Sequence, residues 1–214
     1  MYDYGNWLLV IFNIALFLYF LKTSFRPRTK ADWRTYNTFG AFIVALFAEM
    51  YGFPLTIYLL TSVFGNRLGL DFTHNKGHLL NTILGLSGDP HFNILHIISY
   101  ALIIGGFMLL GKSWGLLYKS QREHKLATTG VYHYIRHPQY VAFTLIIFGF
   151  LVQWPTLITL IMAPILIFRY IRLANIEEKE VEKMFGDAYQ NYANKTPAFF
   201  PKISLNTTEK FKGM

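Results

Sequence analysis

Apolar runs alternate with polar connections along most of the chain. Five runs are long, covering residues 7–21, 39–64, 94–110, 141–154 and 156–173. A helix needs about 20 mostly apolar residues to cross a bilayer. The pattern therefore predicts an all-α, polytopic membrane helix bundle with about five transmembrane helices.

Two of these runs carry turn residues. The second contains Gly52 and Pro54, and a proline inside a helix removes a backbone hydrogen bond and bends the axis. We therefore expect a kink in residues 39–64. The fourth run is short and is followed by Trp154-Pro155 with no charged linker, which predicts a tight helical hairpin with the fifth run.

The segment after the fifth run has a different pattern. Apolar side chains recur there every three to four residues, at Ile176, Val181, Met184, Phe185, Ala188 and Tyr192. Such spacing is typical of an amphipathic helix with one buried face. We expect this helix over residues 175–193, on the cytoplasmic side.

Three parts of the chain follow from these elements. Residues 1–110 form N-terminal transmembrane helices with an external loop at 65–92, in which residues 79–84 form a short interfacial helix. Residues 111–203 form a core of cytoplasmic loop, helical hairpin and amphipathic helix. The polar residues 204–214 form a tail.

Composition agrees with a membrane protein and excludes several classes. The chain is 53% hydrophobic and only 15% charged, and it has no cysteine. Disulfides, thiolate metal sites and a cysteine nucleophile are therefore excluded. The net charge of +8 indicates topology and contact with anionic membrane lipids. No basic helix with interleaved aromatic side chains indicates nucleic-acid binding.

Basic residues alternate between the connections. The external connection carries only Arg67 and Lys76. The connections on either side of it carry clusters, which are Lys22, Arg26, Arg28, Lys30 and Arg34, and then Lys112, Lys119, Arg122, Lys125 and Arg136. Because basic residues concentrate in cytoplasmic loops, we expect the N-terminus outside and the C-terminus in the cytoplasm. The sequence shows no eukaryotic sorting signal, which favours the plasma (inner) membrane of a prokaryote.

The polar residues best suited to catalysis or binding lie directly beside the fourth run. An Arg136-His137-Pro138-Gln139-Tyr140 cluster directly precedes it, and a Glu177-Glu178 pair follows the fifth run. Ionisable groups at the edge of a membrane helix are costly to bury and indicate a functional site. We expect the two clusters to form one active site at the cytoplasmic face.

Several motifs in residues 111–203 resemble one family. The segment from His124 to Tyr132, which includes Gly130, is followed by Arg-His-Pro-x-Tyr, Glu-Glu and Phe-Gly-x-x-Tyr-x-x-Tyr. In order and approximate spacing these motifs are similar to those of integral-membrane isoprenylcysteine carboxyl methyltransferases and phospholipid methyltransferases. The resemblance implies transfer of a methyl group from S-adenosyl-L-methionine to a lipophilic acceptor that enters from the bilayer.

The same resemblance implies roles for individual residues. Arg136 would orient an anionic substrate group or the cofactor carboxylate. Where the acceptor is an amine or thiol, a general base is needed, and the candidates are His137, Glu177 and Glu178. Contacts to the cofactor fall on seven residues: His124, Gly130, Tyr132, His137, Pro138, Tyr140 and Glu178.

Other functions fit part of the pattern. Sterol reductases that use NADPH have a similar Arg-His-Pro-x-Tyr region, although they usually have more spans. A non-catalytic membrane protein of the same fold is a third alternative. Arg136 would then be an interface anchor, and Glu177 and Glu178 would be solvated residues near a helix start.

Four histidines lie in or near the external loop. They are His74, His78, His91 and His96, and the first two are four residues apart. This spacing can place two imidazoles on one helix face. The loop is rich in turn residues, however, so solvated loop or gate residues are the favoured interpretation and no metal ligand is assigned.

Overall fold

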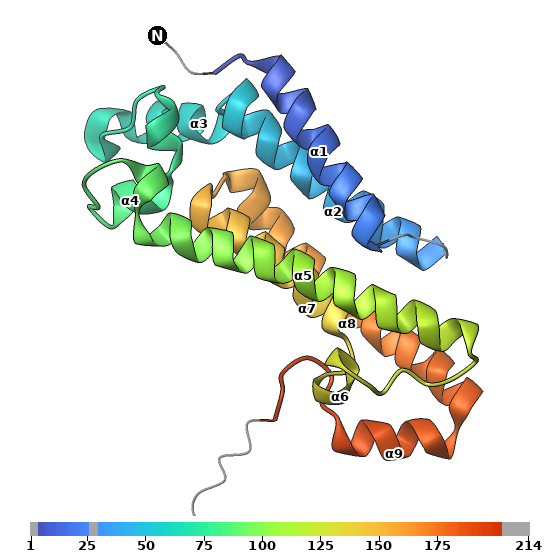
Figure 1. Cartoon of the computed structure of the whole chain (residues 1–214). Coiled ribbons are helices and arrows are strands. Elements are labelled where there is room, and N and C mark those ends of the chain that lie inside the picture. The colour runs from blue at the N-terminus through green and yellow to red at the C-terminus, as the bar shows by residue number, and fades with distance from the viewer. Residues whose placement is uncertain (1–3, 26–29, 203–214) are drawn as a thin grey trace, which may run out of the picture.

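The computed structural model describes residues 4–25 and 30–202, and this part of the chain is helical and contains no strand. Figure 1 shows α5 running along the length of the bundle, with α3 and α4 near one end and α6 and α9 near the other. The α-helices are α1 (Trp7–Phe25), α2 (Lys30–Phe47), α3 (Leu55–Phe64), α4 (Leu79–Ile83), α5 (Ile94–Arg122), α6 (Val131–Tyr134), α7 (Pro138–Gln153), α8 (Leu157–Phe185) and α9 (Asp187–Lys195). The all-α prediction is confirmed, whereas the tail at 204–214 lies outside the described residues, as do Arg26 and Arg28.

Three helices are long and apolar enough to cross a membrane, namely α1, α5 and α8, and the bent pair of α2 and α3 makes a fourth if it counts as one span. Helix α7 has 16 residues. At 1.5 Å per residue it is about 24 Å long, which is less than the hydrocarbon core of about 30 Å. Five complete spans therefore remain a prediction.

The kink expected from Gly52 and Pro54 is confirmed. A short π-helix over Ala48–Gly52 ends α2, and the chain turns by 66° before α3. The Glu49 Oε2 atom accepts a hydrogen bond from the Thr56 backbone N–H across the break, at 2.8 Å. Thr56 Oγ1 in turn accepts from the Leu157 N–H at 2.9 Å, so the bend is attached to the beginning of α8.

The bundle core is built on the crossing of α5 and α7. A Cβ atom added to Gly106 on α5 would lie 2.5 Å from Ile146 Cγ1 and 3.0 Å from the Ala142 carbonyl oxygen of α7. A Cβ atom on Gly149 of α7 would lie 2.6 Å from Ile103 Cγ1 of α5. Small residues at such positions let two membrane helices approach closely.

The amphipathic helix predicted over residues 175–193 is not one helix. Residues up to Phe185 continue α8, and Gly186, with φ of 48°, separates it from α9. The predicted apolar face is only partly buried in the protein, since Ile176 is 45% and Met184 69% exposed. Glycine adopts this left-handed backbone without the Cβ clash of other residues, so Gly186 permits the break.

Two other boundaries differ from the prediction or refine it. Helix α5 continues to Arg122, so residues 111–122 are helical where a cytoplasmic loop was expected. The hairpin between α7 and α8 is confirmed. It is closed by a capping box in which Thr156 and Thr159 exchange side-chain to backbone hydrogen bonds at 3.1 Å, which satisfies N–H groups at the beginning of α8.

The connection from α3 to α5 is folded rather than open. The short helix expected at residues 79–84 is confirmed as α4. The solvated-loop interpretation of the histidines is wrong for His78 and His96, each of which is 2% exposed. Both lie in a packed group of rings that includes Trp154 at the end of the hairpin.

The α5–α7 crossing makes a stability prediction with a neighbouring control. Gly106→Ala should destabilise the protein by about 1–3 kcal/mol, as overpacking of a close contact does. Gly105→Ala should be neutral or stabilising, because a Cβ atom there meets nothing within 4 Å among the described residues and alanine favours a helix. Thermal unfolding in detergent measures both, and equal melting temperatures would contradict the packing described.

Candidate active site

The Arg-His-Pro motif forms the beginning of α7. Pro138 is the first residue of the helix and His137 is its N-cap, a place where proline costs no hydrogen bond. The backbone N–H groups of Arg136 and His137 donate to the carbonyls of Pro197 and Ala198 at 2.9 and 3.0 Å. The chain that follows α9 therefore fixes the backbone on which the motif side chains stand.

Glu178 of α8 joins the two charged members of the motif. Its Oε1 atom accepts from Arg136 Nε at 2.9 Å and lies 2.7 Å from Arg136 Nη2. The same oxygen lies 2.8 Å from His137 Nε2. The side chains of Arg136 and Glu178 are 15% and 23% exposed, so the ion pair is largely shielded from water.

Arg136 also connects the site to the end of α9. Its Nη1 atom donates to the carbonyls of Ala193 and Thr196 at 3.1 and 2.6 Å. All three guanidinium nitrogens are thus engaged by the protein, and Arg136 is not a solvated interface anchor. Its predicted role in orienting an anionic substrate remains a prediction, and any such substrate would compete with these acceptors.

Glu177 is held by a second set of hydrogen bonds. Tyr140 Oη donates to Glu177 Oε1 at 2.5 Å, and Gln139 Nε2 donates to Oε2 at 3.4 Å. Tyr132 Oη donates to Gln139 Oε1 at 3.3 Å, and Tyr192 Oη donates to the Tyr132 carbonyl at 2.6 Å. The two glutamates lie inside α8, so the helix-start interpretation of them is wrong.

His137 has a defined protonation pattern. Burial lowers its pKa, and the hydrogen bond that the ring donates to Glu178 opposes this effect. Because Nε2 faces a carboxylate oxygen, we assign the ring proton to Nε2. The Nδ1 atom then carries a lone pair, is buried without a hydrogen-bond partner among the described residues, and lies 3.7 Å from Glu177 Oε2. This atom is placed to accept a proton.

Of the remaining residues predicted to contact the cofactor, Gly130 has a structural role and His124 lies apart from the site. Gly130 has φ of 60° and precedes α6, and a Cβ atom there would lie 2.6 Å from Leu116 Cδ1, so glycine is required. His124, in the turn after α5, has φ of 51° and is exposed. It takes no part in the hydrogen bonds of the site described above. The structure brings together Tyr132, Arg136, His137, Tyr140, Glu177 and Glu178, with Pro138 setting the helix start.

Sequence reasoning missed residues whose roles depend on the fold. Gln139 connects Tyr132 to Glu177, and only its position inside the motif gave a signal. Tyr170 of α8 stacks on Tyr140, with ring centroids 5.5 Å apart and planes 16° apart. A tyrosine within an apolar run has no distinguishing pattern, so this contact could not be predicted.

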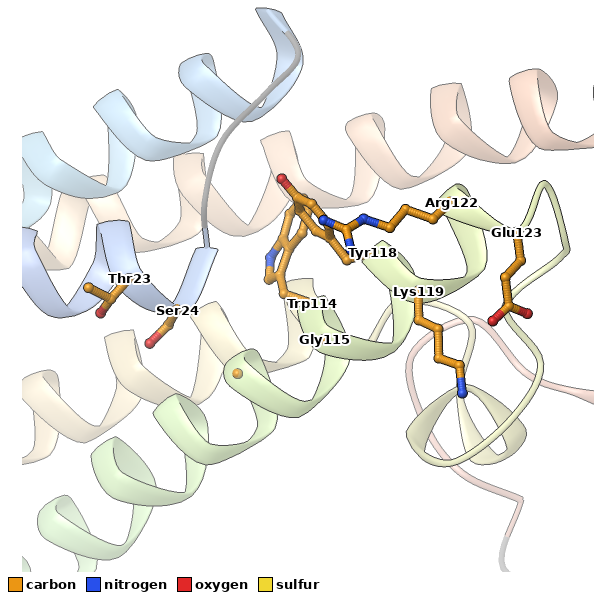
Figure 2. A pocket seen from close by; sticks show the side chains of 9 residues that line it. Thr23, Ser24, Trp114, Gly115, Tyr118, Lys119, Arg122 and Glu123 are labelled. Carbon is orange, nitrogen blue, oxygen red and sulfur yellow. The ribbon is translucent and has the colours of Figure 1, made fainter.

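A cavity of about 780 Å³ opens beside the C-terminal half of α5. Figure 2 shows Thr23 and Ser24 of α1 on one side of it and Trp114 of α5 on the other. The Trp114 Nε1 atom is buried without a partner among the described residues. The rest of the lining comes from α5 and the turn after it: Gly111, Gly115, Tyr118, Lys119, Arg122 and Glu123.

Comparisons with known proteins relate this part of the chain to methyltransferases. Residues 93–188 match the family model described as phospholipid methyltransferase. A protein-S-isoprenylcysteine O-methyltransferase of Schizosaccharomyces pombe is 26% identical over 202 residues, which cover 77% of this chain and 86% of that enzyme. No solved structure matches the chain significantly.

Two bacterial relatives match a shorter part. The cobalt-zinc-cadmium resistance protein CzcN of Cupriavidus metallidurans is 35% identical over 98 residues, or 45% of each chain. A methanethiol S-methyltransferase of Crocosphaera subtropica is 32% identical over 108 residues, covering 47% of this chain and 40% of that enzyme. The chain therefore spans less than half the length of these two relatives.

The apolar helices and these matches define the class of the chain, which is an integral-membrane methyltransferase. Its residues 93–188 match the phospholipid methyltransferase family, and its relatives include enzymes named isoprenylcysteine O-methyltransferases. The resemblance seen in the motifs is thereby confirmed. The alternative of a sterol reductase receives no support.

The ion pairs of Glu178 make a prediction with a matched control. Glu178→Gln removes the charge shared by Arg136 and His137, and should destabilise the protein by about 1.5–3 kcal/mol, as loss of charged hydrogen bonds does. Glu180→Gln, two residues away and exposed, should change stability by less than about 0.5 kcal/mol. Thermal unfolding compares the two, and equal effects would contradict a bridging role for Glu178.

Proposed function

We propose that the chain transfers a methyl group from S-adenosyl-L-methionine to a lipophilic acceptor. The observation that carries the proposal is the convergence of Arg136, His137 and Tyr140, at the beginning of α7, on Glu177 and Glu178 of α8. This cluster contains the motif residues that resemble the methyltransferase family. It lies in the part of the chain that the family model matches.

The residues of the cluster fit this cofactor. When bound, S-adenosylmethionine supplies an activated methyl group on a positively charged sulfur. Carboxylates attract its cationic groups and accept hydrogen bonds from its ribose hydroxyls, while tyrosine faces favour cations and flat rings. Glu178 with the rings of Tyr132 and Tyr140 provides these features, and the unpaired His137 Nδ1 atom provides a further polar contact.

The protein's contribution to the reaction is positioning and control of a proton. Alignment of two reactants can supply about 7–11 kcal/mol of the barrier to a bimolecular step. An acceptor carboxylate needs no base. An amine or thiol must lose a proton, and the lone pair on His137 Nδ1, backed by Glu178 on Nε2, suits that task, as does the neighbouring Glu177.

The cavity beside α5 suits an acceptor with an apolar body and a polar end. Trp114 and Tyr118 provide aromatic walls, and Lys119 and Arg122 provide cations. We propose that the acceptor reaches it from the bilayer. The relatives are named for isoprenylcysteine and methanethiol, which supports an oxygen or sulfur nucleophile on an apolar molecule.

Calorimetric titration with S-adenosylhomocysteine tests the cofactor. We expect micromolar binding by the wild-type chain, loss of at least tenfold in affinity for His137→Ala and Glu178→Ala, and no change for Glu180→Ala. Labelled S-adenosylmethionine should then transfer its methyl group to apolar acceptors presented in detergent. Binding of NADPH instead, or no binding by folded wild-type protein, would refute the proposal.

The alternation of basic residues supports an N-terminus outside and a cytoplasmic site in a prokaryotic inner membrane. The chain has no cysteine, so single cysteines can report the topology. In intact cells, an impermeant maleimide should label Ser87→Cys in the external connection and should not label Glu180→Cys until the membrane is opened. The reverse pattern would invert the orientation.

A further inference from the structure

Four histidine rings form one group at the end of the molecule opposite α9. His74 lies in a 3-10 turn, His78 precedes α4, His91 lies in a second 3-10 turn and His96 is in the first turn of α5. Neighbouring ring centroids are 4.8–5.9 Å apart. One ring nitrogen from each of His74, His78 and His91 falls within 4.8 Å of the others.

Two of the rings have the outer contacts of metal ligands. His78 Nδ1 lies 2.9 Å from the Gln153 carbonyl oxygen, and His91 Nδ1 lies 2.8 Å from Asp89 Oδ1. These acceptors place the ring proton on Nδ1 and leave the Nε2 lone pair available. Metal-binding histidines usually donate their second nitrogen to a carbonyl or carboxylate in this way.

Buried nitrogens without partners point to a missing ligand. The Nε2 atoms of His78 and His96 are buried and have no hydrogen-bond partner within the described residues. Buried polar atoms are nearly always satisfied by protein, water or an ion. An ion at the centre of the group would satisfy the Nε2 atom of His78.

Packing holds the rings in place. Trp154 lies against His74 and His78, with ring centroids 4.5 and 4.7 Å apart, and Tyr51 stacks on His74 at 5.2 Å. A Cβ atom on Gly77 would fall 1.9 Å from Trp154 Cζ2, so only glycine lets the backbone between the two histidines approach the indole. The histidine rings are therefore held in place by packing, as the ligands of a preformed binding site are, and are not side chains of a solvated loop.

We propose that His74, His78 and His91 bind a divalent transition-metal ion such as Zn²⁺. Neutral imidazoles are ligands that zinc, copper, nickel and cobalt prefer. Zn–N bonds of about 2.0–2.1 Å place tetrahedral ligands about 3.3 Å apart, so nitrogens within 4.8 Å of one another need to close by at most about 1.5 Å. The fourth position is left to water, with His96 beside it.

Such an ion would have a structural effect independent of methyl transfer. It would tie residues 74 and 78 to residue 91, and so cross-link the middle of the connection between α3 and α5 to its C-terminal end. Through the contact of His78 with Gln153 it would also attach this connection to α7. The ion therefore should stabilise the folded chain.

The full chain, purified in detergent without a polyhistidine tag and stripped with a chelator, tests the site. Titration with Zn²⁺ should give one ion per chain at micromolar or lower concentration and a higher melting temperature. Tetrahedral Co²⁺ should give visible absorption bands. His74→Ala and His91→Ala should each lower Zn²⁺ affinity at least tenfold, and Asp89→Asn, which removes an outer contact, by about 10–100-fold.

His133→Ala is the matched control, since it removes an exposed histidine distant in sequence from the group, and it should bind Zn²⁺ as the wild type does. Circular dichroism and gel filtration establish that each variant is folded. Absence of Zn²⁺ binding by the folded wild type would overturn the proposal. So would a Zn²⁺ affinity equal to that of the wild type in both His74→Ala and His91→Ala, or a loss in His133→Ala as large as theirs.

Discussion

Glycine at positions 106 and 149 lets α5 and α7 approach until a side chain of one helix meets the backbone of the other. In a membrane, where lipid is as apolar as a leucine side chain, such close contact is a main source of association between helices. The position of α7 fixes the site, because His137 is its N-cap and Tyr140 lies in its first turn. A longer distance between α5 and α7 would displace both from the helix that presents Glu177 and Glu178.

The charges of the polar site must also be neutralised, because the site lies at the ends of apolar helices. A charge at the edge of a bilayer is costly unless it is paired. Glu178 meets both a guanidinium and an imidazole through one oxygen, and Arg136 divides its remaining donors between two carbonyls of the chain end. The charges are therefore neutralised within the protein, and the C-terminal segment becomes part of the site instead of a separate appendage.

The site was more predictable than the boundaries of the elements around it. Burying ionisable groups at the ends of apolar runs costs free energy. That cost identified Arg136, His137, Glu177 and Glu178 as candidate site residues from the sequence alone. The division of the C-terminal helix at Gly186 was not foreseen, because the apolar spacing of residues 175–193 continues across the break.

Contacts between distant segments were also hidden from the sequence. The partners of Arg136 at Ala193 and Thr196 are backbone atoms, which any residue type supplies. The histidine group depends on Trp154, which lies more than 50 residues beyond His96 and meets the loop only after α7 has folded back along α5. The spacing of apolar residues describes one helix at a time and contains no information on contacts between distant segments.

Helix α7 has hydrogen-bonded polar side chains at both ends. His137 precedes its first residue, and Gln153, its last, accepts the hydrogen bond of His78 through its carbonyl and that of Ser99 through its side chain. The two ends are about 24 Å apart at 1.5 Å per residue, and between them the helix is locked against α5. A displacement of the histidine loop along the helix axis would therefore also displace the His137 imidazole at the opposite end of α7.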